Sequence, residues 1–143
     1  MSNVADVPLI LVIDDDEAVL QIYQELLVDE GYRLCVHTFP PASTGALHRA
    51  RPDVVLLDLL FAGEDAGWHF LRKLKGDPVT ADIPVVVATA NQRYAQQCRS
   101  QFDAWQCGIV LKPFDIDELA AAIQLALRRS ERAGATAMPP GTR

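Results

Sequence analysis

The stretch LILVIDDDE at residues 9–17 decides the fold, because an apolar run of strand length ends directly in three aspartates. An unbroken apolar run, rather than an alternating one, is typical of a strand buried on both faces of a parallel sheet. Further runs of this kind lie at residues 54–57, 84–88 and 109–111, and a more mixed run at 33–38 indicates a strand nearer the edge. The chain therefore predicts five strands.

Segments with helical spacing lie between these runs. Apolar residues recur every three or four positions, as they do in a helix with one buried face. They are Val19, Ile22, Tyr23, Leu26 and Leu27; Trp68, Leu71 and Leu74; and Ile116, Leu119, Ala120, Ile123 and Leu127. The Gln-rich stretch 92–106 has a weaker pattern, and we predict a single helix there. With right-handed crossovers, the alternation favours a doubly wound α/β domain with a five-stranded parallel sheet, flavodoxin-like strand order 2-1-3-4-5 and five helices.

Composition and charge narrow the class of protein. The 143 residues are 50% hydrophobic and 22% charged, which is typical of one soluble globular domain. No apolar stretch approaches the ~20 residues that span a bilayer, and no basic segment precedes the first apolar run. We therefore expect a cytoplasmic protein without membrane contact, with a domain at 1–130 and a flexible tail at 131–143.

The charge and the cysteines disfavour a nucleic-acid partner, a zinc site and a disulfide framework. The net charge of −6 argues against nucleic acid as the direct partner. Cys35, Cys98 and Cys107 form no CxxC pair, so neither a zinc site nor a disulfide framework is indicated. We expect all three to be reduced thiols.

Polar residues follow four of the predicted strands at the point where each strand ends. Asp14, Asp15 and Asp16 follow the first strand, Asp58 the third, Thr89 the fourth and Lys112 the fifth. Ligand sites of open α/β sheets lie beyond the carboxyl ends of the strands, so these side chains should meet in one crevice. Crowded carboxylates stay ionised only when a cation neutralises them, and a hard divalent ion, Mg²⁺ first, suits their oxygen atoms.

The same residues carry a resemblance to the receiver domain of two-component response regulators, over about residues 7–130. ILVIDDDE resembles the family's acidic opening, VVLLDLL its acceptor strand, VVVATA its threonine strand and VLKPF its Lys-Pro strand. The resemblance implies that Asp58 is the phosphoryl acceptor and that Asp14 and Asp15 bind Mg²⁺ with the backbone carbonyl of Leu60. It further implies that Thr89 and Lys112 contact the phosphoryl group, and that the bond between Lys112 and Pro113 is cis.

Each residue also has a simpler interpretation when it is taken alone. An aspartate after a strand is often a helix cap, and we assign that role to Asp16. A threonine in a strand or a lysine on a surface is usually ordinary, so Thr89 and Lys112 have value only within the set. The chain also departs from the family pattern: Ile109 stands where an aromatic residue is usual, and the loop after Asp58 is one residue longer before Gly67.

These observations predict a stand-alone receiver rather than an enzyme. A histidine kinase or phosphotransfer protein would supply the phosphoryl group, and a downstream effector protein would bind a face built from the fourth helix, fifth strand and fifth helix. A homodimer linked to phosphorylation stays an open expectation.

Two alternatives remain beside this reading. Ile109 makes a binding module that works without phosphate plausible. A phosphohydrolase with an aspartyl-phosphate intermediate would favour an acid two residues after Asp58, where the chain has Leu60.

Overall fold

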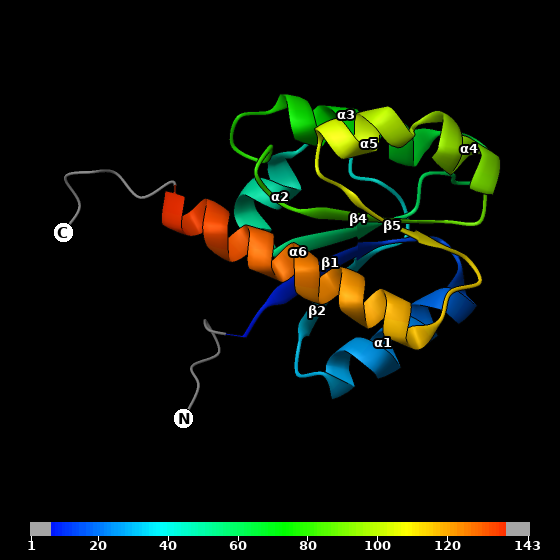
Figure 1. The fold of residues 1–143 in the computed structure, drawn as a ribbon, viewed down its shortest axis with the longest axis horizontal. Coiled ribbons are helices and arrows are strands. Elements are labelled where there is room, and N and C mark those ends of the chain that lie inside the picture. Colours follow the sequence, from blue (N-terminus) through cyan, green and yellow to red (C-terminus); the bar gives the residue numbers. More distant parts are fainter. Residues whose placement is uncertain (1–6, 137–143) are drawn as a thin grey trace.

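The computed structural model describes residues 7–136, in which five strands alternate with helices (Figure 1). The strands are β1 (Leu9–Ile13), β2 (Arg33–His37), β3 (Val54–Leu57), β4 (Val85–Thr89) and β5 (Gly108–Leu111). The helices are α1 (Glu17–Asp29), α2 (Gly45–Ala50), α3 (Ala66–Gly76), α4 (Gln92–Gln97), α5 (Arg99–Ala104) and α6 (Ile116–Thr136).

The five strands form one parallel sheet in the order β2-β1-β3-β4-β5, as the sequence predicts. The mixed strand β2 lies at an edge. The order reverses between β1 and β3, so the carboxyl ends of these two strands border the crevice in which doubly wound sheets bind ligands.

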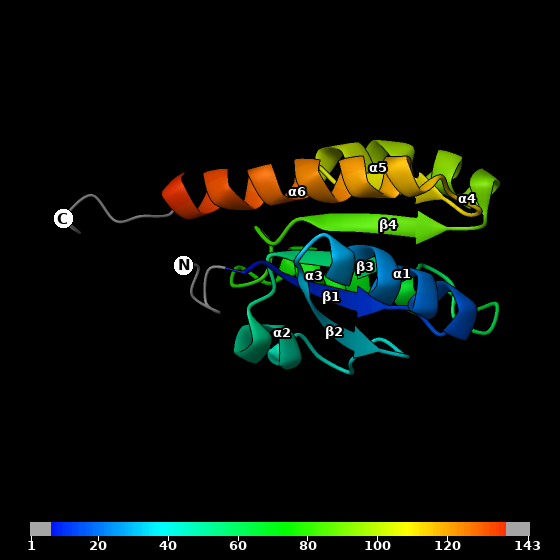
Figure 2. The same cartoon turned by 90° about the horizontal axis from the view of Figure 1, so that it is seen from below.

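Helices cover both faces of the sheet, and alternate strand residues point into two separate apolar layers. One layer packs α2, α3 and α5 against residues such as Leu11, Val55 and Val87. The other packs α1 and α6 against residues such as Ile10, Leu56 and Val86. Figure 1 shows α2, α3, α4 and α5 on one side of the strands, and Figure 2, the same cartoon seen from below, also shows α1 and α6. The continuous apolar runs therefore reflect burial on both faces.

The helix expected at 92–106 is divided in two, which gives six helices among residues 7–136 rather than five. Cys98 lies between α4 and α5, with φ −96° and ψ 6°, outside the ordinary helical region. Only Ala95 of α4 is buried, so little apolar burial holds the two short helices in one continuous helix.

Several predicted helix boundaries are confirmed, and one is displaced. Helix α1 ends just before Gly31, which has a φ of +90° that favours glycine, and α3 ends at Gly76. Helix α6 continues through Thr136, past residue 130, where the sequence predicts the tail to begin. The rest of that predicted tail, 137–143, lies outside the described residues.

Two further expectations concern the cysteines and the membrane. The three thiols are free. Among residues 7–136, no helix has the length and apolar character that crossing a bilayer requires.

Phe102 anchors α5 in the core, since its ring is fully buried beside α3 and the sheet. We predict that Phe102→Ala lowers the free energy of unfolding by about 3–5 kcal/mol, because it removes a buried ring and leaves a cavity. Phe39→Ala is the matched control, because Phe39 is 60% exposed and should cost far less. Urea unfolding followed by circular dichroism measures both, and equal losses would show that Phe102 does not hold α5 in place.

Candidate functional site

Three carboxylates meet at the carboxyl end of the sheet. Asp14 follows β1 and is buried, Asp15 next to it is exposed, and Asp58 follows β3. Each offers an oxygen atom, and these three atoms lie within 4.8 Å of one another. The parallel pairing of β1 with β3 creates this convergence, because it sets Ile13 beside Leu57 and so brings the two strand ends level.

Asp16 has the capping role predicted for it. Its Oδ1 accepts hydrogen bonds from the amides of Ala18 (3.0 Å) and Val19 (3.3 Å) at the start of α1. The Asp16 amide donates to Asp14 Oδ1 at 2.9 Å, which fixes the orientation of the buried carboxylate. The three consecutive aspartates therefore divide into two members of the acidic cluster and one cap.

Lys112 joins the two strand-end aspartates. Its Nζ lies 2.6 Å from Asp14 Oδ2 and 3.3 Å from Asp58 Oδ2. The Lys112 amide donates to the carbonyl of Thr89 at 2.9 Å, which continues the pairing of β4 with β5, and the bond from Lys112 to Pro113 is cis, as the resemblance implies. The ammonium thus supplies the positive charge that crowded carboxylates need.

The pKa values of the site follow from burial and from these charges. Burial raises the pKa of Asp58 above its ordinary value; the charge of Lys112 lowers it without cancelling the rise, and the charge of Asp14 adds to it. Burial alone would lower the pKa of Lys112, but the hydrogen bond and charge of Asp14, with the charge of Asp58, raise it instead. Lys112 therefore stays protonated, while ionised Asp58 is held at a cost to the folded state.

Thr89 and an open pocket complete the site. The Thr89 side chain is buried, and its Oγ1 accepts a hydrogen bond from the Asn91 amide at 3.2 Å. The pocket has a volume of about 460 Å³ and is lined by Asp58, Leu60, Thr89, Ala90, Asn91 and Gln92. The structure therefore brings the six residues of the predicted site together at the carboxyl end of the sheet. They are Asp14, Asp15, Asp58, Leu60, Thr89 and Lys112.

The loop after Asp58 is closed tightly onto the acceptor strand. The amides of Gly67 and Trp68 both donate to the carbonyl of Leu59, at 3.0 and 3.3 Å. A Cβ at Gly67 would lie 1.9 Å from the carbonyl oxygen of Asp58, so only glycine fits there. Within this loop Phe61 and Glu64 form an isolated bridge around Ala62 and Gly63, both with positive φ.

Two residues near the site were missed at the level of sequence. Asn91 lines the pocket and caps α4, its Oδ1 accepting from the Tyr94 amide at 2.8 Å; an Asn two residues after Thr89 and just before a helix is a signal that could have found it. The Tyr23 hydroxyl is buried and has no hydrogen-bond partner among residues 7–136, and burial together with the charges of Asp14, Asp58 and Asp16 raises its pKa. Its helical spacing indicated only a core position.

The donor set suits a hard divalent cation. Three carboxylate oxygens within 4.8 Å of one another match the oxygen ligands that Mg²⁺ takes, and one of the three carboxylates is exposed to solvent, from which such an ion keeps several waters. The residues present therefore fit the ion that the sequence predicts.

Comparisons with known proteins agree with this geometry. Residues 10–124 match the family model described as the response regulator receiver domain. The chain is 32% identical over 125 residues to the DNA-binding dual master transcriptional regulator RpaA of Synechocystis sp., covering 87% of this chain and 51% of that protein. It is 29% identical over 120 residues to the phosphate regulon transcriptional regulatory protein PhoB of Escherichia coli, covering 84% and 52%. The chain thus spans about half the length of these two curated relatives.

Solved structures share the fold. The chemotaxis protein CheY4 of Vibrio cholerae superposes with a TM-score of 0.72 at 20% identity, covering 85% of this chain and 99% of that one. The N-terminal domain of a response regulator receiver protein from Methanoculleus marisnigri superposes with a TM-score of 0.61 at 32% identity, covering 83% and 95%.

We predict that Asp58→Asn stabilises the metal-free protein at neutral pH. Because the pKa of Asp58 is raised in the folded state, the unfolded chain loses this proton first as the pH rises, and the wild type loses stability over that range. The advantage of Asp58→Asn should therefore grow from acid to neutral pH and vanish below the ordinary pKa of aspartate.

Urea unfolding in the presence of a chelator, repeated across this pH range, measures the effect. Asp65→Asn is the control, since Asp65 is half exposed and pairs with the exposed His69. A destabilising effect of Asp58→Asn at neutral pH would contradict the electrostatic description of the site.

Proposed function

This chain belongs to the response regulator receiver domain family, and we propose that it accepts a phosphoryl group on Asp58 from a histidine kinase or a phosphotransfer protein. The observation that carries the proposal is the pairing of Lys112 Nζ with both Asp14 and Asp58 inside a cluster of three carboxylates. A lone helix cap or a surface lysine would not need this arrangement.

The chemistry is an in-line displacement at phosphorus. An Asp58 carboxylate oxygen forms the new O–P bond while the N–P bond of a phosphohistidine donor breaks, and its electron pair returns to the imidazole nitrogen, which takes up a proton. Such transfers depend mainly on positioning and on stabilising the charge of the moving group. The hydrogen bond from the Leu60 amide to Asp58 Oδ1, at 3.3 Å, helps to hold the nucleophile toward the pocket.

Lys112 and Thr89 would take oxygens of the transferred group. The ammonium already lies 3.3 Å from Asp58, so it can remain paired when the carboxylate becomes an acyl phosphate. Asp14, Asp15 and Asp58, with the carbonyl of Leu60, would hold Mg²⁺, which neutralises phosphoryl charge when it is bound.

The consequence is a switch that acts through another protein. The added negative charge draws Thr89 and Lys112 toward Asp58, and a packed α/β domain converts such a local pull into a choice between two surface arrangements. We propose that a downstream effector protein reads the face formed by α4, α5, β5 and α6, and that phosphorylation can also favour a homodimer through it.

A second candidate is a receiver-like binding module that works without phosphate. Ile109 favours it, because this partly buried β5 residue replaces the aromatic side chain that the resemblance implies. The two candidates differ in whether Asp58 is modified at all.

Incubation with acetyl phosphate and Mg²⁺, followed by intact-protein mass spectrometry, separates them. We expect a mass gain of one phosphoryl group that Asp58→Asn abolishes and that Asp14→Asn and Lys112→Ala reduce severalfold. Asp65→Asn, in the same loop but outside the cluster, should be phosphorylated like the wild type. A wild-type protein that stays unmodified with acetyl phosphate and with kinases would favour the phosphate-independent module.

Leu60 should make the acyl phosphate long-lived. Its side chain lines the pocket beside the acceptor and gives water no polar group through which to approach the phosphorus atom. We predict that the wild type keeps its phosphoryl group for many minutes and that Leu60→Asn shortens the lifetime severalfold, as followed by the decay of the modified mass after the donor is removed. A wild-type half-life of seconds would contradict this role.

A further inference from the structure

An aromatic cluster joins α3 to α4 and α5 on the face of the sheet that also bears α2. Trp68 of α3 lies at its centre, with ring centroids 6.3 Å from Tyr94, 5.7 Å from Phe102 and 5.7 Å from Trp105. Trp68, Tyr94 and Trp105 are all partly exposed, whereas Phe102 is buried. The function described so far gives this cluster no role.

Trp68 is attached to the acceptor. Its amide and that of Gly67 donate to the carbonyl of Leu59, the residue that follows Asp58. Because the Gly67 backbone lies against the Asp58 carbonyl, the start of α3 cannot slide freely relative to the acceptor. The backbone of Trp68 is therefore held in place relative to Asp58.

Tyr94, by contrast, is attached to Thr89. Thr89 Oγ1 accepts from the Asn91 amide, and Asn91 Oδ1 accepts from the Tyr94 amide. Two short hydrogen-bonded steps thus connect the hydroxyl that faces the phosphoryl pocket to the backbone that carries the Tyr94 ring.

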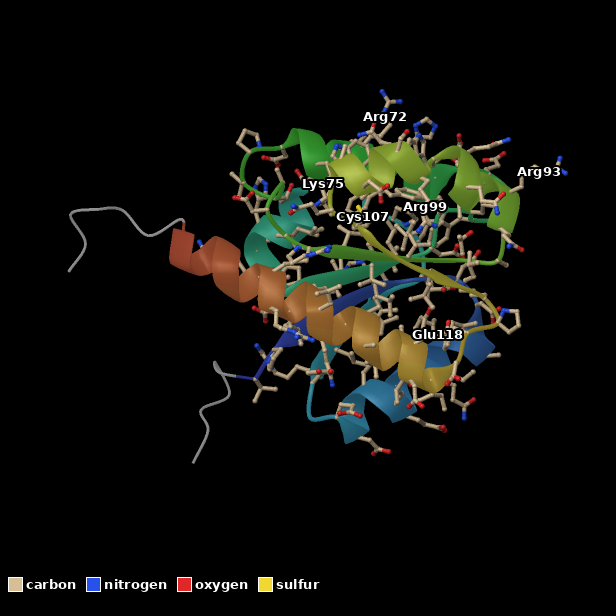
Figure 3. All side chains as sticks on the ribbon, viewed as in Figure 1. Arg72, Lys75, Arg93, Arg99, Cys107 and Glu118 are labelled. Atoms are coloured by element: carbon tan, nitrogen blue, oxygen red, sulfur yellow. The ribbon has the colours of Figure 1, made fainter. Side chains whose placement is uncertain are left out.

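Helix α4 makes few buried contacts with the rest of the domain, whereas α5 is anchored by a buried aromatic side chain. Ala95 is the buried residue of α4, and Arg93 extends from this helix away from the rest of the molecule (Figure 3). Helix α5 is anchored by buried Phe102, and the guanidinium of Arg129 donates to the carbonyl of Gln106 just beyond its end. A displacement that begins at Asn91 would therefore move α4 about Cys98, against a stationary α5.

We propose that phosphorylation of Asp58 displaces the Tyr94 ring relative to Trp68, and that this aromatic contact couples the site to the surface of α4. The inference rests on the proposed phosphorylation of Asp58. When the Thr89 hydroxyl turns to donate to a phosphoryl oxygen, its Oγ1 leaves the Asn91 amide, the start of α4 shifts, and the Tyr94 ring moves across Trp68.

The movement has a surface consequence. A pocket of about 320 Å³ lies between α4, α5 and β5, and Ala95, Arg99 and Ile109 are among the residues that line it. Since α4 forms one wall and β5 the other, a shift of α4 changes the width of this pocket. The switch therefore alters a surface that a partner protein can read.

Tryptophan fluorescence tests the proposal directly. In Trp105→Phe, Trp68 is the sole tryptophan, and its emission should change when acetyl phosphate is added to protein already equilibrated with Mg²⁺. The change should follow the fraction phosphorylated, measured by mass in the same samples, and should be lost in Trp105→Phe/Asp58→Asn. Adding Tyr94→Leu should abolish most of the emission change while phosphoryl incorporation continues, and Tyr94→Phe, which keeps the ring, should retain it.

Tyr32→Leu in the same Trp105→Phe background is the matched control, because Tyr32 is partly exposed in the connection between α1 and β2, outside the cluster. Circular dichroism establishes that each variant is folded. If Asp58 is phosphorylated but Trp68 emission stays constant, or if Tyr94→Leu keeps the full change, the switch proposal is overturned and the phosphoacceptor function stands. If Asp58 is not phosphorylated under any donor, both proposals fail.

Discussion

The ion pairs from the ammonium of Lys112 to Asp14 and Asp58 are the interaction on which the rest of the site depends. All three side chains are at least 88% buried, because their exposed fractions are 12%, 1% and 12%. Removing the ammonium of Lys112 would leave two buried carboxylates without compensation, and breaking a buried ion pair in this way typically costs about 3–5 kcal/mol. The charge of Lys112 compensates the two carboxylates only in part, because burial keeps the pKa of Asp58 raised. A site of this kind gains from binding a cation, which offsets the charge of the crowded carboxylates.

The fold supplies the positions of these charges. The carboxyl ends of strands β1, β3 and β5 lie on the same side of the sheet, because the sheet is parallel. Apolar layers on both faces hold those strands rigidly. The loops beyond the carboxyl ends of the strands can then differ in length without disturbing the cluster. Rigid strand ends with adjustable loops suit a switch, because the chemistry needs fixed atoms and the signal needs a segment that moves.

Much of this could be predicted from the sequence, for a physical reason. The strands buried on both faces have continuous apolar runs, and the polar residue that ends each run must lie at the carboxyl end of its strand. Because those ends meet in a parallel sheet, the residues that could be placed together are Asp14, Asp58, Thr89 and Lys112. The break at Cys98 could not be predicted, because it depends on how little of α4 is buried. The cluster around Trp68 was equally hidden, since its members come from α3, α4, α5 and the residue after α5, and their approach is set by tertiary packing.

The central claim is that Asp58 is the group that becomes covalently modified within this ion-paired cluster, and the most direct measurement locates the modification chemically. Borohydride reduces an acyl phosphate to an alcohol, so protein treated with acetyl phosphate and Mg²⁺, reduced, digested and sequenced by mass spectrometry should contain homoserine at position 58. Homoserine at Asp14 or Asp15 instead, or aspartate retained at position 58 in protein that has gained a phosphoryl group, would contradict the account.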